Sequence, residues 1–106
     1  MKARYLIAIA ASFSFSATAF AATDAAALFK QSNCAMCHEA ASSSLGPSLK
    51  EISAKYAKTD GAQTQLEAKV RNGGKGSFGS MPMPATPKSV SDENIKDIVH
   101  WILSQK

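Results

Sequence analysis

The sequence predicts a small all-α domain of about four helices. Four segments carry apolar residues at the spacing of one helix face, and no segment alternates as a half-buried strand does. A stretch between the third and fourth segments, residues 73–89, holds four glycines and three prolines and is expected to be non-helical. The chain has 106 residues, which is enough for one such domain.

The helices are expected over residues 24–31, 48–57 and 62–72, and from Asp92 onward. Their apolar stripes are Ala25, Leu28 and Phe29; Leu49, Ile52 and Tyr56; Ala62, Leu66 and Val70; and Ile95, Ile98, Val99, Ile102 and Leu103. Capping residues agree with these bounds: Thr23 or Asp24 precedes the first helix, Asn-Gly-Gly ends the third, and Ser91 precedes the last.

The first 21 residues have the pattern of a cleaved secretory signal peptide. Lys2 and Arg4 give a positive start, an apolar run follows at residues 5–11, and an A-x-A sequence ends at Ala21. The alternative is an uncleaved anchor, but serines interrupt the apolar stretch, which falls short of the ~18 residues of a spanning helix. Cleavage would leave an exported domain of residues 22–106.

Charge and size restrict the partners of this domain. Removing Lys2 and Arg4 lowers the basic count from 12 to 10, against 8 acidic residues, which leaves a net charge of +2. There is no basic run and no interleaved aromatic platform, so a nucleic-acid partner is not expected. A domain this small often depends on a disulfide, a metal or a cofactor for stability.

Both cysteines lie in the sequence CAMCH, from Cys34 to His38. A disulfide would close a very short loop and restrain the unfolded chain little. A thioredoxin-like pair would need a βαβ setting, and a zinc site would need more ligands than the chain offers nearby. The remaining interpretation is covalent c-type haem attachment, for which C-x-x-C-H is a specific signature. Cys34 and Cys37 would bond to the porphyrin, and His38 would bind the iron.

The second axial position decides between an electron carrier and an open haem site. A methionine opposite histidine is the arrangement of electron-transfer cytochromes. Met81 and Met83 alternate with prolines in a stiff, extended segment, so they should point in different directions, and one of them is expected to face the iron. The alternative is that both only pack. His100 falls off the apolar stripe of the last helix and is expected at the surface, whereas Trp101 should pack on its flank.

At this point the chain resembles the small bacterial class I cytochromes c, most closely those of the c-551 type. The stretches that carry the resemblance are LFKQSNCAMCH, GPSL, RNGGKGSFGSMPMP and HWILSQK, in the order and spacing of that family. The resemblance implies one covalent haem c wrapped by about four helices. It also implies thioether bonds from Cys34 and Cys37, His38 as the proximal ligand, and a Pro47 carbonyl that accepts the histidine ring N–H.

The resemblance also selects between the two methionines. The ligand of the family matches Met83, while Met81 matches an aliphatic neighbour. Two positions depart from the family. Phe78 stands where many relatives carry a tryptophan that donates to a haem propionate, and Thr86 stands where an asparagine often donates to the ligand sulfur. The basic groups that can compensate at the propionate are Lys69, Arg71 and Lys75.

The implied function is electron transfer rather than catalysis. The family consists of monomers that carry single electrons between respiratory complexes, such as terminal oxidases or nitrite reductase, through transient contacts. A mild basic face would speed such encounters, although each lysine taken alone is an ordinary solvated charge. The lysines that can form this face are Lys30, Lys50, Lys55, Lys58, Lys75 and Lys88. The rival hypothesis is a haem enzyme or gas sensor with one open axial position.

Overall fold

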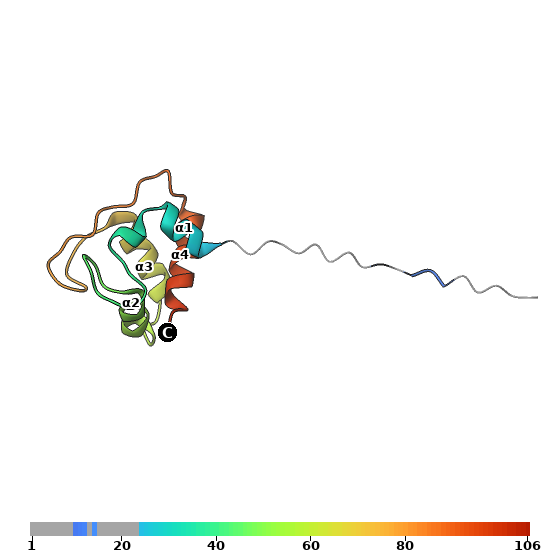
Figure 1. The fold of residues 1–106 in the computed structure, drawn as a ribbon, viewed down its shortest axis with the longest axis horizontal. Helices are drawn as coiled ribbons and strands as arrows, with labels where there is room; N and C mark the ends of the chain where they lie inside the picture. The colour runs from blue at the N-terminus through green and yellow to red at the C-terminus, as the bar shows by residue number, and fades with distance from the viewer. Residues whose placement is uncertain (1–9, 13, 15–23) are drawn as a thin grey trace, which may run out of the picture.

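The computed structural model describes residues 10–12, 14 and 24–106. Its helices are α1 (Ala25–Gln31), α2 (Leu49–Tyr56), α3 (Ala62–Asn72) and α4 (Asp92–Leu103), with a short 3-10 turn, η1 (Cys34–Met36) (Figure 1). The described part of the chain contains no strand, so the all-α prediction is confirmed. None of its helices is long and apolar enough to cross a membrane. Apart from residues 10–12 and 14, the predicted signal peptide lies outside the described residues.

Side-chain caps explain where three of the helices begin. The Asp24 carboxylate accepts from the Ala27 N–H at 3.1 Å, and the Ser91 hydroxyl accepts from the Asn94 N–H at 3.1 Å. Each bond satisfies one of the backbone donors that the first turn of a helix leaves free. At α2, Ser48 forms a reciprocal capping box with Glu51. The predicted bounds therefore agree with the structure to within a residue or two.

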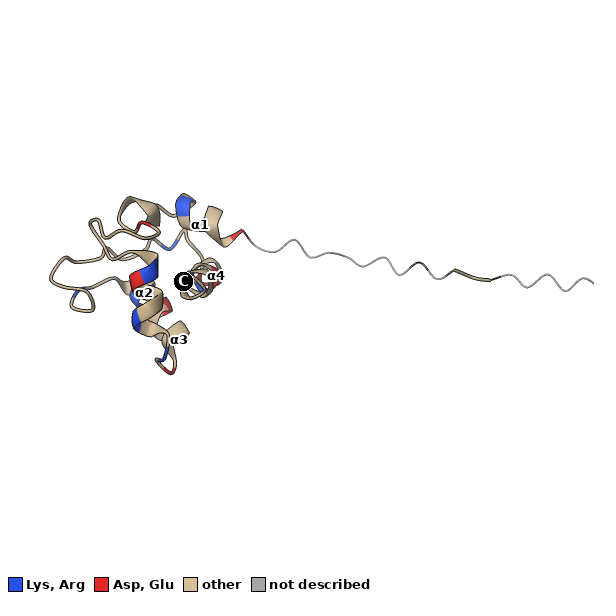
Figure 2. Cartoon of the chain, turned by 60° about the horizontal axis from the view of Figure 1, so that its bottom comes forward, with Lys and Arg blue, Asp and Glu red and all other residues tan. Residues whose placement is uncertain are grey.

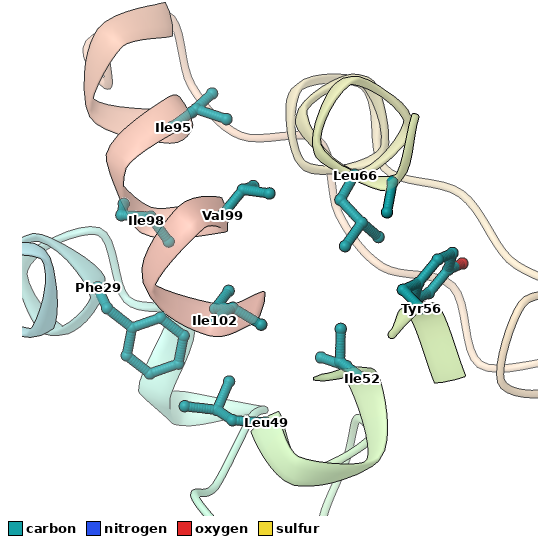
Figure 3. Close-up of a cluster of buried hydrophobic side chains, with 10 residues drawn as sticks. Phe29, Leu49, Ile52, Tyr56, Leu66, Ile95, Ile98, Val99 and Ile102 are labelled. Carbon is teal, nitrogen blue, oxygen red and sulfur yellow. The ribbon is translucent and has the colours of Figure 1, made fainter. Parts of the chain in front are cut away.

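The core lies where α4 crosses the other three helices. Ile95, Ile98, Val99 and Ile102 are buried along one face of α4, as its apolar stripe predicts (Figure 3). The other buried apolar residues are Phe29 from α1, Leu49, Ile52 and Tyr56 from α2, and Ala62 and Leu66 from α3.

The two residues that follow Val99 behave as expected. His100 is exposed on α4, and the Trp101 ring packs on Phe29 with 5.3 Å between the ring centroids. That aromatic contact joins the first helix to the last. The long segment between α3 and α4, residues 73–91, is non-helical, as its glycines and prolines predict, and is called the 73–91 loop below.

The capping box of α2 also perturbs an acid. The Glu51 carboxylate accepts from the Ser43 hydroxyl at 2.6 Å and from the Ser48 N–H at 2.7 Å. These hydrogen bonds, that from Ser43 first, lower the pKa of Glu51 below its ordinary value of 4.5. The ionised Glu51 carboxylate therefore stabilises the folded protein fully above the pKa that Glu51 has in the unfolded chain. This contribution is lost as the pH falls through the lower pKa that Glu51 has in the folded protein.

We therefore expect Glu51→Gln to reduce the free energy of unfolding at neutral pH and to lose this difference from the wild type in acid. Urea unfolding of both proteins between neutral pH and about pH 3 measures the difference. Glu39→Gln is the control, because the Glu39 side chain forms no hydrogen bond within the described part of the chain. A wild-type advantage over Glu51→Gln that grows on acidification would contradict the prediction.

Candidate functional site

The two cysteines lie in a tight turn that the helix predictions did not include. Asn33 adopts a left-handed conformation at φ 63°, and η1 follows directly. The N–H groups of Cys37 and His38 both donate to the Cys34 carbonyl, at 3.2 and 3.0 Å. The shared acceptor keeps the five motif residues compact. A five-residue motif has no hydrophobic period, so the turn leaves no signal in a helical pattern.

Both thiols are free and half-buried, and both line the same cavity. Burial raises the pKa of the Cys34 thiol above its ordinary value, and the neighbouring Cys37 adds to the rise. The pair is available for covalent attachment and is not committed to a disulfide in this structure.

The His38 ring is held by the following turn. Its Nδ1 lies 2.8 Å from the Pro47 carbonyl oxygen, which can only accept, so Nδ1 carries the proton and Nε2 is left with a free lone pair. The Gly46 N–H donates to the Cys37 carbonyl at 2.9 Å and holds the turn against the ring. A β-carbon at Gly46 would lie 2.8 Å from His38 Cε1. Glycine is therefore required here by close packing.

We expect Gly46→Ala to displace the His38 ring and weaken its bond to Pro47. Overpacking of this kind costs about 1–3 kcal/mol of unfolding free energy, which urea unfolding measures. The NMR signal of the His38 Nδ1 proton should exchange faster with solvent than in the wild type. Ser44→Ala in the same turn is the control and should leave the signal unchanged. An unchanged signal in Gly46→Ala would contradict the close packing.

These side chains line a cavity of about 440 Å³, within the size range of cofactor sites. The cysteine turn and residues 43–47 form one part of the wall, and residues 74–84 form another. Core side chains of all four helices complete it, among them Phe29, Ile52, Leu66 and Ile98. Seven of the ten buried core residues thus also line the cavity, as expected for a domain folded around a large apolar group.

The 73–91 loop brings both candidate methionines to the cavity wall. An antiparallel bridge fixes the loop: the Gly74 N–H donates to the Met83 carbonyl at 2.9 Å, and the Met83 N–H donates to the Gly74 carbonyl at 2.8 Å. Met83 is half-buried at this bridge, whereas Met81 is 64% exposed. The backbone thus holds Met83 more firmly than Met81.

Phe78 also lines the cavity and is 43% exposed. The Lys55 ammonium lies 4.4 Å from the centroid of its ring and donates to the Ser77 carbonyl. This clasp joins α2 to the loop across 22 residues of sequence. In the sequence, Lys55 is only one of several lysines expected at the surface, because no periodic pattern reveals such a contact.

The three basic groups considered for a propionate are separated by the structure. Lys69 and Lys75 line the cavity. Arg71 instead bonds to Asp92 and to loop carbonyls. Of the six lysines expected to form a basic face, Lys75 lines the cavity and Lys55 contacts Phe78. The others do not line the cavity, and α2 carries both charge signs (Figure 2).

The hydroxyl and the N–H of Thr86 bond to α3 and not to the Met83 sulfur. Its hydroxyl donates to the Val70 carbonyl at 2.7 Å, and its N–H donates to the same oxygen at 3.2 Å. The hydroxyl proton is therefore not available to the Met83 sulfur. Thr86 anchors the loop to the C-terminal end of α3 instead.

A small helical domain with a free Cys-x-x-Cys-His turn on the wall of a large apolar cavity has the features of a c-type haem domain. Comparison with known proteins agrees. The sequence model of the cytochrome c family matches residues 22–106. Cytochrome c-551 of Pseudomonas aeruginosa is 36% identical over 106 residues, which are 100% of each chain. The chain therefore belongs to the cytochrome c family.

Two further relatives match at higher identity. Cytochrome c-551 of Stutzerimonas stutzeri is 42% identical over 85 residues, which are 80% of each chain. The crystal structure of wild-type Nitrosomonas europaea cytochrome c552 superposes with a TM-score of 0.72 at 43% identity, over 76% of this chain and 99% of that chain. The predicted class I fold and the similarity to the c-551 type are confirmed.

Membership of this family means that the chain carries one covalently attached haem c and serves as a monohaem electron carrier. The side chains that line the cavity are suited to hold a haem c. Two free thiols and an imidazole with a free Nε2 face one cavity. The absence of a side chain at Gly46 leaves the imidazole room beside the turn.

Proposed function

We propose that the chain is a periplasmic carrier of single electrons between respiratory complexes, with His38 and Met83 as axial ligands and Cys34 and Cys37 as thioether residues. Bound haem supplies a one-electron ferric/ferrous couple. One observation carries the proposal: an imidazole oriented by Pro47 and a methionine whose backbone is fixed by the bridge to Gly74 come from separate segments to line one cavity. Two protein ligands leave no position for a substrate, so the protein is not an enzyme.

The chain's own residues carry out the supporting steps. Pro47 keeps the His38 ring in one tautomer and one orientation. The apolar cavity wall excludes water, which disfavours the extra positive charge of the oxidised state. Because the Pro47 carbonyl and the backbone bridge to Gly74 already hold the two axial residues in place, little has to rearrange when the charge changes.

The contacts with redox partners are expected to be transient and small. A net charge of +2 on residues 22–106 offers weak steering toward an acidic partner. We propose that the carrier is a monomer after removal of residues 1–21, with donor and acceptor complexes, such as a terminal oxidase or nitrite reductase, binding near the cavity.

The test begins with protein purified from the periplasm. Its mass should equal that of residues 22–106 plus one haem, and its ferric spectrum should contain the sulfur–iron charge-transfer band of a His/Met site. Carbon monoxide added to the reduced protein should not bind at once. Immediate binding would show an open site, as in a haem enzyme or gas sensor. A colourless protein of unmodified mass would refute haem attachment altogether.

A further inference from the structure

Arg71, at the C-terminal end of α3, uses its whole guanidinium group to hold the 73–91 loop and the first residue of α4. Nε and Nη2 donate to Asp92 Oδ1 at 3.1 and 2.7 Å. Nη1 donates to the Pro87 carbonyl at 3.1 Å and to the Thr86 carbonyl at 3.4 Å, and Nη2 also donates to the Val90 carbonyl at 2.7 Å. Five hydrogen bonds thus join one side chain to four residues between Met83 and the first turn of α4.

Most of this network is directed at the backbone rather than at the carboxylate. The Asp92 side chain is 92% exposed, whereas that of Arg71 is 24% exposed. An ion pair with so exposed a partner contributes little by itself. The three carbonyls belong to a segment without regular structure, and charge-assisted bonds to them are about twice as strong as neutral ones. Arg71 therefore acts chiefly by holding the loop backbone in place through its hydrogen bonds to the carbonyls.

From Met83 onward, the loop is attached at three successive points to α3 and to Gly74, which lies two residues beyond the end of α3. The bridge between Gly74 and Met83 is the first, and the two bonds from Thr86 to the Val70 carbonyl are the second. Arg71 supplies the third, directly after Thr86. Lifting the segment that carries Met83 away from the end of α3 would break these attachments together.

We propose that Arg71 is a positioning residue for the Met83 ligand, acting through the loop backbone to keep the sulfur at its place on the cavity wall. The inference rests on the proposed His38/Met83 ligation. A lysine at the same position offers one ammonium group, which cannot reach four acceptors spread along the loop in the planar geometry of a guanidinium. Arginine is thus specifically required, and not only a positive charge.

The test uses ferric holoprotein and imidazole as the competing ligand. Imidazole binds the iron only when Met83 has left, so its apparent affinity reports the population of the open loop. We expect Arg71→Gln and Arg71→Lys each to raise this affinity by at least about tenfold, the effect of losing one hydrogen bond to a charged group. In the same two variants, hydrogen exchange at the Thr86 and Val90 amides should be faster than in the wild type.

Two control variants separate positioning from general destabilisation. Ser53→Ala removes the bond from the Ser53 hydroxyl to the Leu103 carbonyl, 3.0 Å, which joins α2 to α4 far from the loop in sequence. It should lower the melting temperature without changing imidazole affinity more than about twofold. Asp92→Asn keeps an acceptor oxygen for Arg71 and leaves the three bonds from Arg71 to the loop carbonyls in place. It should also leave the imidazole affinity within about twofold of the wild type.

The outcomes distinguish this proposal from the proposed function. A wild type without the sulfur–iron band refutes the ligation on which both rest. A wild type with the band, but with imidazole affinity equal in wild type, Arg71→Gln and Ser53→Ala, overturns the role of Arg71 alone. Full retention of the wild-type affinity in Arg71→Lys overturns the requirement for a guanidinium.

Discussion

Replacing Met83 by alanine is expected to open one axial position of the haem. The methyl group of alanine cannot reach or bind a metal, and the bridge to Gly74 holds the backbone in place, so no neighbouring group moves in. The reduced variant should bind carbon monoxide at once, and the sulfur–iron band should vanish. The midpoint potential should fall on the order of a hundred millivolts, within the ~0.8 V range that axial ligands set.

Met81→Ala is the matched control for this prediction. Met81 is also followed by a proline and lines the same cavity, but it is 64% exposed and makes no backbone bridge. It should keep the sulfur–iron band, exclude carbon monoxide and leave the potential nearly unchanged. If Met81→Ala opens the site and Met83→Ala does not, the assignment of the ligand is reversed.

The helices could be predicted from the sequence because their signals are local. The apolar stripe of α4 recurs over nine residues, from Ile95 to Leu103, and Ser91 caps the helix in the predicted place. Periodicity and capping depend on residues within one or two turns, so they are visible without the rest of the fold. The same reasoning placed His100 outside the core and Trp101 beside it.

The site could be predicted only in part, because some of its contacts join residues that are close in the sequence and others join residues that are far apart. Cys34, Cys37 and His38 lie within five residues, so their spacing alone indicates the chemistry. The clasp of Lys55 on Phe78 and the network of Arg71 join residues 15 to 23 positions apart. A surface cation has no period and no fixed offset to its partner, so only the folded chain reveals such contacts.

Gly73 illustrates the same limit, since its role depends on a segment ten residues away. The sequence marks it as a helix stop, which its φ of 69° and its bond to the Lys69 carbonyl bear out. The structure adds a close approach: a β-carbon there would lie 2.3 Å from the Met83 carbonyl oxygen and 2.7 Å from the Ala85 nitrogen. These atoms are backbone, so no side-chain rotation can relieve the clash.

We therefore expect Gly73→Ala to be the most damaging of the six possible glycine-to-alanine changes. Either the loop backbone moves and the bridge between Gly74 and Met83 breaks, or the domain loses more than about 4 kcal/mol of unfolding free energy. In both cases the sulfur–iron band of the holoprotein should weaken or disappear. Urea unfolding and the ferric spectrum of the same sample measure the two effects together.

Gly61→Ala separates the clash from the conformational cost of alanine at positive φ. Gly61 has a φ of 72°, close to that of Gly73, but nothing lies within 4 Å of its added β-carbon. Its replacement should cost only about 1–2 kcal/mol, the price of left-handed alanine, and should leave the spectrum intact. Equal losses of unfolding free energy in Gly73→Ala and Gly61→Ala would mean that Gly73 serves only to end a helix. A larger loss in Gly73→Ala, together with a spectral change, would mean that the end of α3 is the surface against which the iron ligand is set.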